Sequence, residues 1–228
     1  MEIRLASLTS GAQAAVGTTV IIDVFRAFTT AAVALSRGAQ RIVMVDSLDN
    51  ALALRSSGVG DYCIGERDST KPPGFDFGNS PAELERAEVA GKTLIQTTSN
   101  GTAGINDAHG ADCIYAGAFV TAEATVRAIL RHAPAIVTLV AIGRRNGTIR
   151  ADEDELCALY LRARLEGRQP DVAAVRGLLA SMPPPPNPKL VAEGAYDLKD
   201  RETAAQVDAM KLVITVRREG RLLIAEPE

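Results

Sequence analysis

The sequence predicts an α/β protein with three layers, in which helices cover both faces of a mainly parallel, mixed sheet. Short apolar runs bounded by glycine, proline or polar residues are typical of buried strands; they cover residues 20–22, 41–45, 93–96, 112–115 and 136–142. Alanine-rich segments with helical spacing lie between the runs; they cover residues 29–37, 48–56, 81–89, 121–132 and 152–166. Because strands and helices alternate, the strands are expected to be largely parallel.

Two stretches of the chain resemble each other. Residues 17–23 and 91–97 each read as a strand ending in a polar turn, and each leads through a helix to a Gly-Ala pair, at Gly38 and Gly110, before another strand. This pattern predicts an internal duplication of a βαβ unit with both polar turns at the same edge of the sheet. A chance similarity of two such units explains the pattern equally well.

The length of 228 residues, 46% of them hydrophobic, is enough for one sizeable core. We therefore expect a single domain over residues 1–228. A proline-rich stretch at 182–188 predicts an extended surface connection, because proline fixes φ and lacks the N–H donor. Apolar runs on either side of Glu219 and Gly220 predict a C-terminal β-hairpin at 212–225.

Composition narrows the class of partner. The net charge of −3 leaves no basic surplus for a nucleic acid or an anionic membrane. The apolar stretches fall far short of the roughly 20 residues that span a bilayer, and we expect a cytoplasmic protein with a small-molecule substrate. Three widely spaced cysteines argue against disulfides or a zinc site. Symmetric dimers are the commonest assembly, so a homodimer is the default expectation.

The first candidate site lies at a strand-to-helix turn. Open parallel sheets bind ligands beyond the carboxyl ends of their strands, and Asp23 follows such a strand, with Arg26 three residues later. A carboxylate can hold a hard cation while an arginine forks onto phosphate or sulfonate oxygens. An equally good alternative is that Asp23 caps the next helix and Arg26 is solvated.

The corresponding turn of the second unit is the next candidate. Its hydroxyls, its backbone N–H groups and its glycine, which permits close approach, could cradle a phosphate; the residues are Ser99, Asn100, Gly101 and Thr102. Taken alone, an ordinary Ser/Thr/Asn turn accounts for this stretch better.

Residues 65–81 form a long irregular segment dense in charge and glycine, a kind of loop that is usually functional inside a compact domain. Its candidate metal ligands are Glu66 and Asp76, and its candidate substrate-binding residues are Arg67, Lys71, Asn79 and Ser80. Alternatively, Asn79 or Ser80 simply begins the helix expected at Pro81.

The last candidate follows the run at 136–142. Arg144 could bind an anion there, and four acids open the next helix, where they complement its dipole. A capping role accounts for Asp152 and Glu155. Glu153 and Asp154 remain as candidate ligands for a metal ion.

Taken together, these clusters resemble the 2-phosphosulfolactate phosphatase family. The matching stretches are residues 23–30, 65–66, 74–81, 97–102 and 153–154. The resemblance implies a three-layer α/β/α fold, a dependence on Mg²⁺, and hydrolysis of 2-phosphosulfolactate to sulfolactate and phosphate, a step in coenzyme M biosynthesis. Phe25 stands where a haloacid-dehalogenase-type phosphatase needs its second aspartate, which argues against that class.

The resemblance and the clusters define an expected active site. Its catalytic residues are Asp23, Arg26, Ser99 and Asn100; its substrate-binding residues are Arg67, Lys71, Asn79, Ser80, Gly101, Thr102 and Arg144; its Mg²⁺ ligands come from Asp23, Glu66, Asp76, Glu153 and Asp154. The attacking group is left open between water, Ser99 and Asp23. Two alternative functions are a small-molecule phosphatase without a preference for a sulfonate, and an anion-binding protein without catalytic activity.

Overall fold

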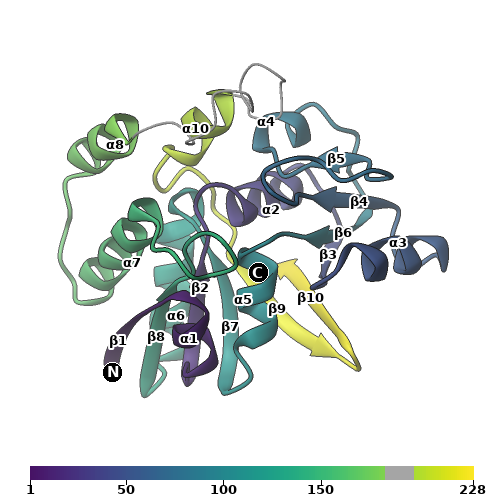
Figure 1. The fold of residues 1–228 in the computed structure, drawn as a ribbon. Helices are drawn as coiled ribbons and strands as arrows, with labels where there is room; N and C mark the ends of the chain where they lie inside the picture. Colours follow the sequence, from purple (N-terminus) through teal and green to yellow (C-terminus); the bar gives the residue numbers. More distant parts are fainter. Residues whose placement is uncertain (183–197) are drawn as a thin grey trace.

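A computed structural model describes residues 1–182 and 198–228, which form a mixed sheet of ten strands with helices on both faces (Figure 1). Across the sheet the strands are β1 (Glu2–Ser7), β8 (Ile136–Ala141), β2 (Gly17–Ile22), β7 (Ala111–Gly117), β9 (Ile214–Glu219), β10 (Leu222–Pro227), β3 (Arg41–Met44), β6 (Thr93–Thr97), β4 (Tyr62–Gly65) and β5 (Phe77–Gly78). The proline-rich stretch expected at 182–188 falls, from residue 183 onward, outside the described residues.

The helices between the strands follow the predicted alternation. They are α1 (Leu8–Gln13), α2 (Ala27–Ser36), α3 (Leu48–Ser56), α4 (Pro81–Leu84), α5 (Gly101–Asp107), α6 (Ala122–His132), α7 (Asp152–Leu165), α8 (Val172–Ser181) and α10 (Leu198–Ala204), with a short 3-10 helix at Phe119–Thr121 before α6. The helix expected over 81–89 is wrong in length, because from Arg86 onward the N–H groups bond three residues back in turns. β1 was not predicted; as an edge strand with one half-buried face it carries no apolar run.

Side chains of β2 show how the layers are built. Ile21 packs in a buried cluster with residues of α1, α2 and α5, whereas Val20 and Ile22 pack in a second cluster with α6 and α7. In the other half of the sheet, Val43 and Ile95 pack with residues of α3. Successive strand side chains point to opposite faces, so this alternation places one helical layer on each side. The predicted three-layer α/β/α fold is confirmed.

The sheet consists of two parallel halves joined by a hairpin. β1, β8, β2 and β7 are parallel to one another, as are β3, β6, β4 and β5. β9 and β10 lie between the halves, and β7–β9, β9–β10 and β10–β3 are all antiparallel. Because three neighbouring pairs are antiparallel, the strands of the two halves run in opposite directions along the order of the sheet. The sheet is also twisted: in Figure 1, β4 and β6 are roughly horizontal, whereas β2 and β7 are roughly vertical.

Each of the two resembling units contributes one strand to each half of the sheet. The first unit runs from β2 to β3 and the second from β6 to β7, yet β2 pairs with β7 and β3 pairs with β6. The two turns therefore do not share one edge of a parallel sheet, as the sequence suggested. The two turns nevertheless meet: the Gln96 side-chain amide of β6 donates to the carbonyl of Ala27 at the start of α2 (3.0 Å).

Candidate active site

Asp23 lies directly after β2, where the buried strand turns into α2. Its side chain is 5% exposed. Oδ1 accepts a hydrogen bond from the N–H of Ala27 (3.0 Å), and the N–H of Gly101 also donates to the carboxylate. Asp23 thus accepts hydrogen bonds from the first turns of both α2 and α5. The bond to α2 is the capping role considered from the sequence.

Gly101 makes this approach possible. A Cβ atom at this position would lie 2.7 Å from Cβ of Ala27 and 2.9 Å from Oδ2 of Asp23, both too close for any side chain. The glycine was predicted to permit close approach to a phosphate. In the structure it permits close approach to a carboxylate of the same chain.

Asp154 brings the first turn of α7 to the same place. Oδ1 accepts from the N–H of Val24 (2.8 Å) and Oδ2 from the N–H of Gly143 (3.0 Å). These two peptides follow β2 and β8, so one buried carboxylate joins the ends of neighbouring parallel strands to α7.

Glu66 joins the loop after β4 to the turn after β6. Oε1 accepts from the N–H of Ser99 (2.7 Å), and Oε2 accepts from the N–H of Ser69 (2.8 Å) and from the Ser99 hydroxyl (3.3 Å). Gly65 precedes it with φ +146°, and a Cβ there would lie 1.9 Å from the carbonyl oxygen of Thr97. Only glycine lets the two strand ends approach this closely.

The carboxylates are near enough to change one another's proton affinity. The pKa of Asp23 is raised from 3.8 to about 7; burial is the main cause, the charges of Glu66 and Glu153 raise it further, and the two N–H donors oppose this. Burial and the charges of Asp23 and Glu153 also raise the pKa of Asp154 well above its usual range. Four acids from three distant parts of the chain therefore form one carboxylate cluster, which comprises Asp23, Glu66, Glu153 and Asp154.

Two arginines lie close to this carboxylate cluster. Burial raises the pKa of Glu153, while the charges of Arg144 and Arg201 lower it. Arg144 is exposed, and Arg201 belongs to α10. Within residues 1–182 and 198–228, no group of three or more His, Cys, Asp and Glu side chains is already arranged to hold a metal ion.

Comparison with known proteins decides the family. A model of the 2-phosphosulpholactate phosphatase family matches residues 5–186. The chain belongs to this family. Proteins named probable 2-phosphosulfolactate phosphatase are similar to it: one from Thermotoga petrophila is 47% identical over 37% of either chain, one from Thermotoga maritima is 40% identical over 48% of this chain and 47% of the relative, and one from Thermoplasma acidophilum is 34% identical over 68% of each.

For the Thermotoga proteins, the chain spans less than half the length of the curated relatives that it matches. In the described part of the chain, no helix has both the length and the apolarity needed to cross a membrane.

Asp76, expected as a metal ligand, is engaged by residues outside the carboxylate cluster. Its Oδ2 accepts from Arg55 (2.7 Å) and from the N–H of Cys63 (2.8 Å). Cys63 precedes Glu66 by three residues along an extended strand, which is about 10 Å. Asp76 therefore fastens its loop to the side of β4, away from the carboxylate cluster.

Arg67 and Lys71, expected to bind substrate, both have partners within the chain. Arg67 donates to the carbonyls of Glu66 (2.8 Å) and Asp46 (2.9 Å) and to the Thr97 hydroxyl (2.8 Å). Its guanidinium is thus occupied in holding together the ends of β3, β4 and β6. Lys71 is exposed and lies beside Glu83, with 3.8 Å between Nζ and Oε1.

The expected phosphate cradle at the start of α5 is largely closed by its own contacts. The N–H of Thr102 donates to the Thr98 hydroxyl (3.2 Å), and its own hydroxyl, fully buried, donates to the Thr98 carbonyl (3.1 Å). Oδ1 of Asn100 accepts from the N–H of Gly147 (3.2 Å). The N–H and the hydroxyl of Thr102 are therefore both engaged by Thr98, whereas Ser99 is half-buried beside Glu66.

Arg26 and Ser80 lie beside Asp200, an acid that was not predicted as a site residue. The buried acid Asp200 of α10 pairs with Arg26 (2.6 Å) and accepts from the Ser80 hydroxyl (2.7 Å). The Ser80 hydroxyl also accepts from the N–H of Glu83 and so caps the start of α4, which is the alternative role considered for Ser80 from the sequence. Asn79 is buried, and its Oδ1 has no hydrogen-bond partner among the described residues. No motif in the Lys-Asp-Arg-Glu run around Asp200 marks it as a site residue.

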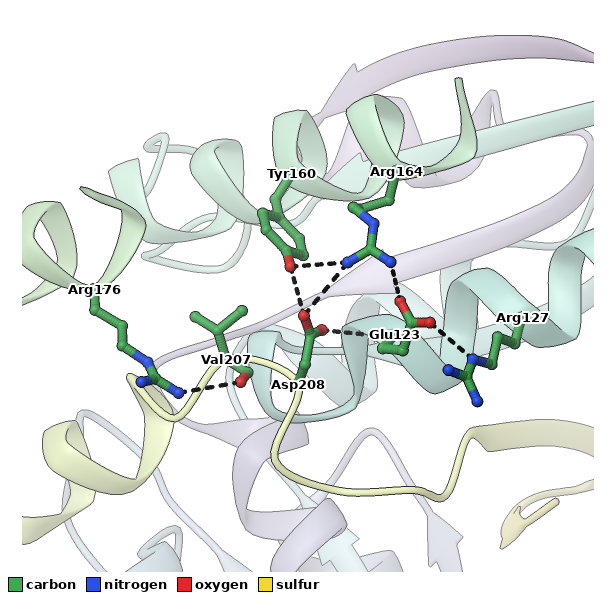
Figure 2. Close-up of polar contacts among 7 residues, drawn as sticks. All are labelled: Glu123, Arg127, Tyr160, Arg164, Arg176, Val207 and Asp208. Atoms are coloured by element: carbon green, nitrogen blue, oxygen red, sulfur yellow. Dashed lines mark hydrogen bonds and ion pairs between the residues drawn. The ribbon is translucent and has the colours of Figure 1, made fainter. Parts of the chain in front are cut away.

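The far end of α7 is held by a separate polar network (Figure 2). The Tyr160 hydroxyl donates to Oδ2 of Asp208 (2.5 Å), and Oδ1 of Asp208 accepts from the N–H of Glu123 at the start of α6 (2.8 Å). Arg164 pairs with Glu123. This network anchors the C-terminal end of α7 to the start of α6.

Proposed function

We propose that this chain is a magnesium-dependent phosphatase that hydrolyses a small anionic phosphate ester, 2-phosphosulfolactate, to sulfolactate and phosphate. The observation that carries the proposal is the carboxylate cluster, in which Asp23 is buried among other acids and its pKa is raised to about 7. Membership of a family named for this reaction agrees with it.

The residues present fit a magnesium ion. Buried carboxylates that raise one another's pKa need a compensating positive charge, and hard oxygen ligands suit Mg²⁺. Mg²⁺ commonly keeps several waters and uses only one or two carboxylates together with the substrate phosphate. A preformed set of three protein ligands is therefore not required.

The hydrogen bonds rank the candidate ligands. Both oxygens of Asp154 already accept backbone N–H groups, so its role is to hold β2, β8 and α7 together. Asp23 also accepts two backbone N–H groups, from Ala27 and Gly101, and a carboxylate has further lone pairs to spare. Its charge coupling to both Glu66 and Glu153 places it between the other acids. No hydrogen bond to Glu153 from another described residue is present. We assign the ion to Asp23 and Glu153; Glu66, whose charge raises the pKa of Asp23, is the third candidate.

A bound Mg²⁺ would supply a Lewis acid for the phosphoryl oxygens. The chain's own groups would orient the ester. Arg26 would fork onto phosphate oxygens, and the exposed Arg144 would meet the sulfonate or carboxylate of the substrate. Because Ser99 donates to Oε2 of Glu66, a proton leaving the serine hydroxyl has a carboxylate to receive it. Ser99 is thus a better-supported candidate nucleophile than Asp23, which both N–H donors hold in place.

Phosphate release tests the function. The purified protein should release phosphate from 2-phosphosulfolactate with Mg²⁺ and lose this activity with a chelator. Binding of phosphate without any turnover would instead support an anion-binding protein. Equal kcat/KM for 2-phosphosulfolactate, phospholactate and phosphoglycolate would abolish the sulfonate preference and leave a general phosphatase.

The nucleophile is tested separately. Rapid quenching during turnover of a phosphorus-labelled ester, followed by digestion, should place the label on the peptide that contains Ser99. Unlabelled peptides together with full activity of Ser99→Ala would indicate direct attack by water.

A further inference from the structure

Helix α10 lies outside the segment that the family model matches, yet it contacts the site. The match ends at residue 186, and α10 begins at Leu198. In Figure 1, α10 lies beside α4 above the end of the sheet that carries α2. Two adjacent residues of α10 face the turn after β2: Asp200 pairs with Arg26, and the Arg201 guanidinium lies 5.2 Å from the centre of the Phe25 ring.

Asp200 joins three elements through a single carboxylate. Oδ2 lies 2.6 Å from Nη1 of Arg26, while Oδ1 accepts from the Ser80 hydroxyl (2.7 Å) and from the N–H of Ala82 (2.9 Å). Arg26 follows the first half of the sheet, whereas Ser80 and Ala82 begin α4 in the second half. The carboxylate therefore bridges the two halves beside the candidate active site.

The burial of this pair makes its geometry specific. The side chains of Arg26 and Asp200 are 6% and 0% exposed. An arginine fork is planar and rigid, so a carboxylate fixed at one nitrogen restricts the orientation of the whole guanidinium. Asp200 is itself held by donors on its other oxygen, so it cannot follow Arg26 if the arginine moves.

We propose that Asp200 is a positioning residue that sets the orientation of the Arg26 guanidinium toward the phosphate of the substrate. The inference rests on the proposed function, in which Arg26 binds that phosphate. Asp200 does not touch the substrate, and its effect on turnover passes through Arg26.

Asp208 offers a matched control in the same C-terminal segment. It is also an acid that bridges elements, but its partners are Tyr160, Arg164 and the N–H of Glu123, which lie at the far end of α7 (Figure 2). A general loosening of the segment after α10 would be produced by Asp208→Asn as well as by Asp200→Asn.

The test is a double-mutant cycle of Asp200→Asn with Arg26→Met. Two quantities are measured for each variant: kcat and KM for 2-phosphosulfolactate with Mg²⁺, and the Kd of inorganic phosphate by calorimetry. We expect Asp200→Asn alone to lower kcat/KM on the order of 10²-fold, because a misplaced binding group costs this much. In the Arg26→Met background the same change should alter kcat/KM and Kd by no more than about twofold. Asp208→Asn should also stay within about twofold of wild type.

Equal losses from Asp200→Asn in both backgrounds, or an equal loss from Asp208→Asn, would overturn the proposal. If Asp200→Asn does not fold, Ser80→Ala takes its place in the cycle, since it removes one donor to Asp200 without touching Arg26; additive losses would again overturn the proposal.

The two readouts separate this inference from the proposed function. A wild-type protein that binds phosphate without hydrolysing esters, with a non-additive cycle in Kd, would refute the phosphatase and retain the positioning role. Turnover with an additive cycle would do the reverse. A wild-type protein that neither binds phosphate nor releases it would refute both.

Discussion

Replacing Asp23 with asparagine is expected to stabilise the metal-free protein above pH 7, even though it removes a residue of the proposed site. The pKa of Asp23 lies at about 7 against an ordinary value of 3.8. Between these values the folded protein holds a proton that the unfolded chain has lost, so the contribution of Asp23 to the free energy of unfolding falls as the pH rises from about 4 to about 7.

The size of the effect follows from that difference. At about 1.4 kcal/mol per pKa unit, ionised Asp23 costs the folded state about 4 kcal/mol above pH 7. Asparagine keeps the shape but has one acceptor oxygen for the N–H groups of Ala27 and Gly101, and the unpaired donor costs about 1–3 kcal/mol. The net gain at pH 8 is therefore about 1–3 kcal/mol, or a rise in Tm of about 5 °C for a chain of this size. At pH 5 the raised pKa of Asp23 costs wild type only about 2 kcal/mol, because the unfolded chain is ionised from about pH 4 upward. The unpaired donor in the variant costs about as much, so the two proteins should then have nearly equal stability.

Urea unfolding of chelator-treated wild type and Asp23→Asn at pH 5 and pH 8 measures how the stability difference between them grows with pH. Asp112→Asn is the control, because Asp112 is exposed at the start of β7 and should show the same small effect at both pH values. A stability difference between Asp23→Asn and wild type that stays constant from pH 5 to pH 8 would refute the reasoning.

Three further outcomes follow from the site. Gly101→Ala should lower kcat at least about tenfold, because its Cβ would lie 2.9 Å from Oδ2 of Asp23, whereas Gly177→Ala meets open space and should stabilise α8 by about 0.5–1 kcal/mol in thermal unfolding. Binding of Mg²⁺ should tighten as the pH rises from 6 to 8 and should release protons below pH 7. Proton release makes the calorimetric heat of binding depend on the buffer, and heats that are equal in all buffers would contradict the raised pKa of Asp23. Glu153→Gln should weaken Mg²⁺ binding at least about tenfold with little loss of stability, while Glu155→Gln, on the same helix but bonded to Ser7, should leave Mg²⁺ binding unchanged.

Much of the fold was predictable because buried strands and alanine-rich helices leave local patterns. The runs at 20–22, 93–96 and 136–142 all lie within or across the strands β2, β6 and β8. β5 could not be found this way, since it is two residues long. The opposed directions of the two sheet halves were also hidden, because they depend on a hairpin that pairs with strands far from it in sequence.

The site was predictable in its acids and less so in its basic and hydroxyl groups. Asp23, Glu66, Glu153 and Asp154 do converge; the first two follow strands, and the other two open the helix after β8. Arg67, expected to bind an anion, instead donates to acceptors at three strand ends, and no local pattern shows these contacts. A side chain's type states what it can bind, but the contacts of the folded chain decide whether it is still available.

The sequence by itself determined which segments become strands and helices and which polar residues end them, because burial patterns and strand-end positions are local properties of the chain. Only the tertiary structure decided that the turns after β2 and β6 pack together and that Asp200 reaches Arg26 across 174 residues. Such contacts are set by how the two sheet halves and the C-terminal segment pack, and this packing depends on the whole core rather than on any neighbouring residues.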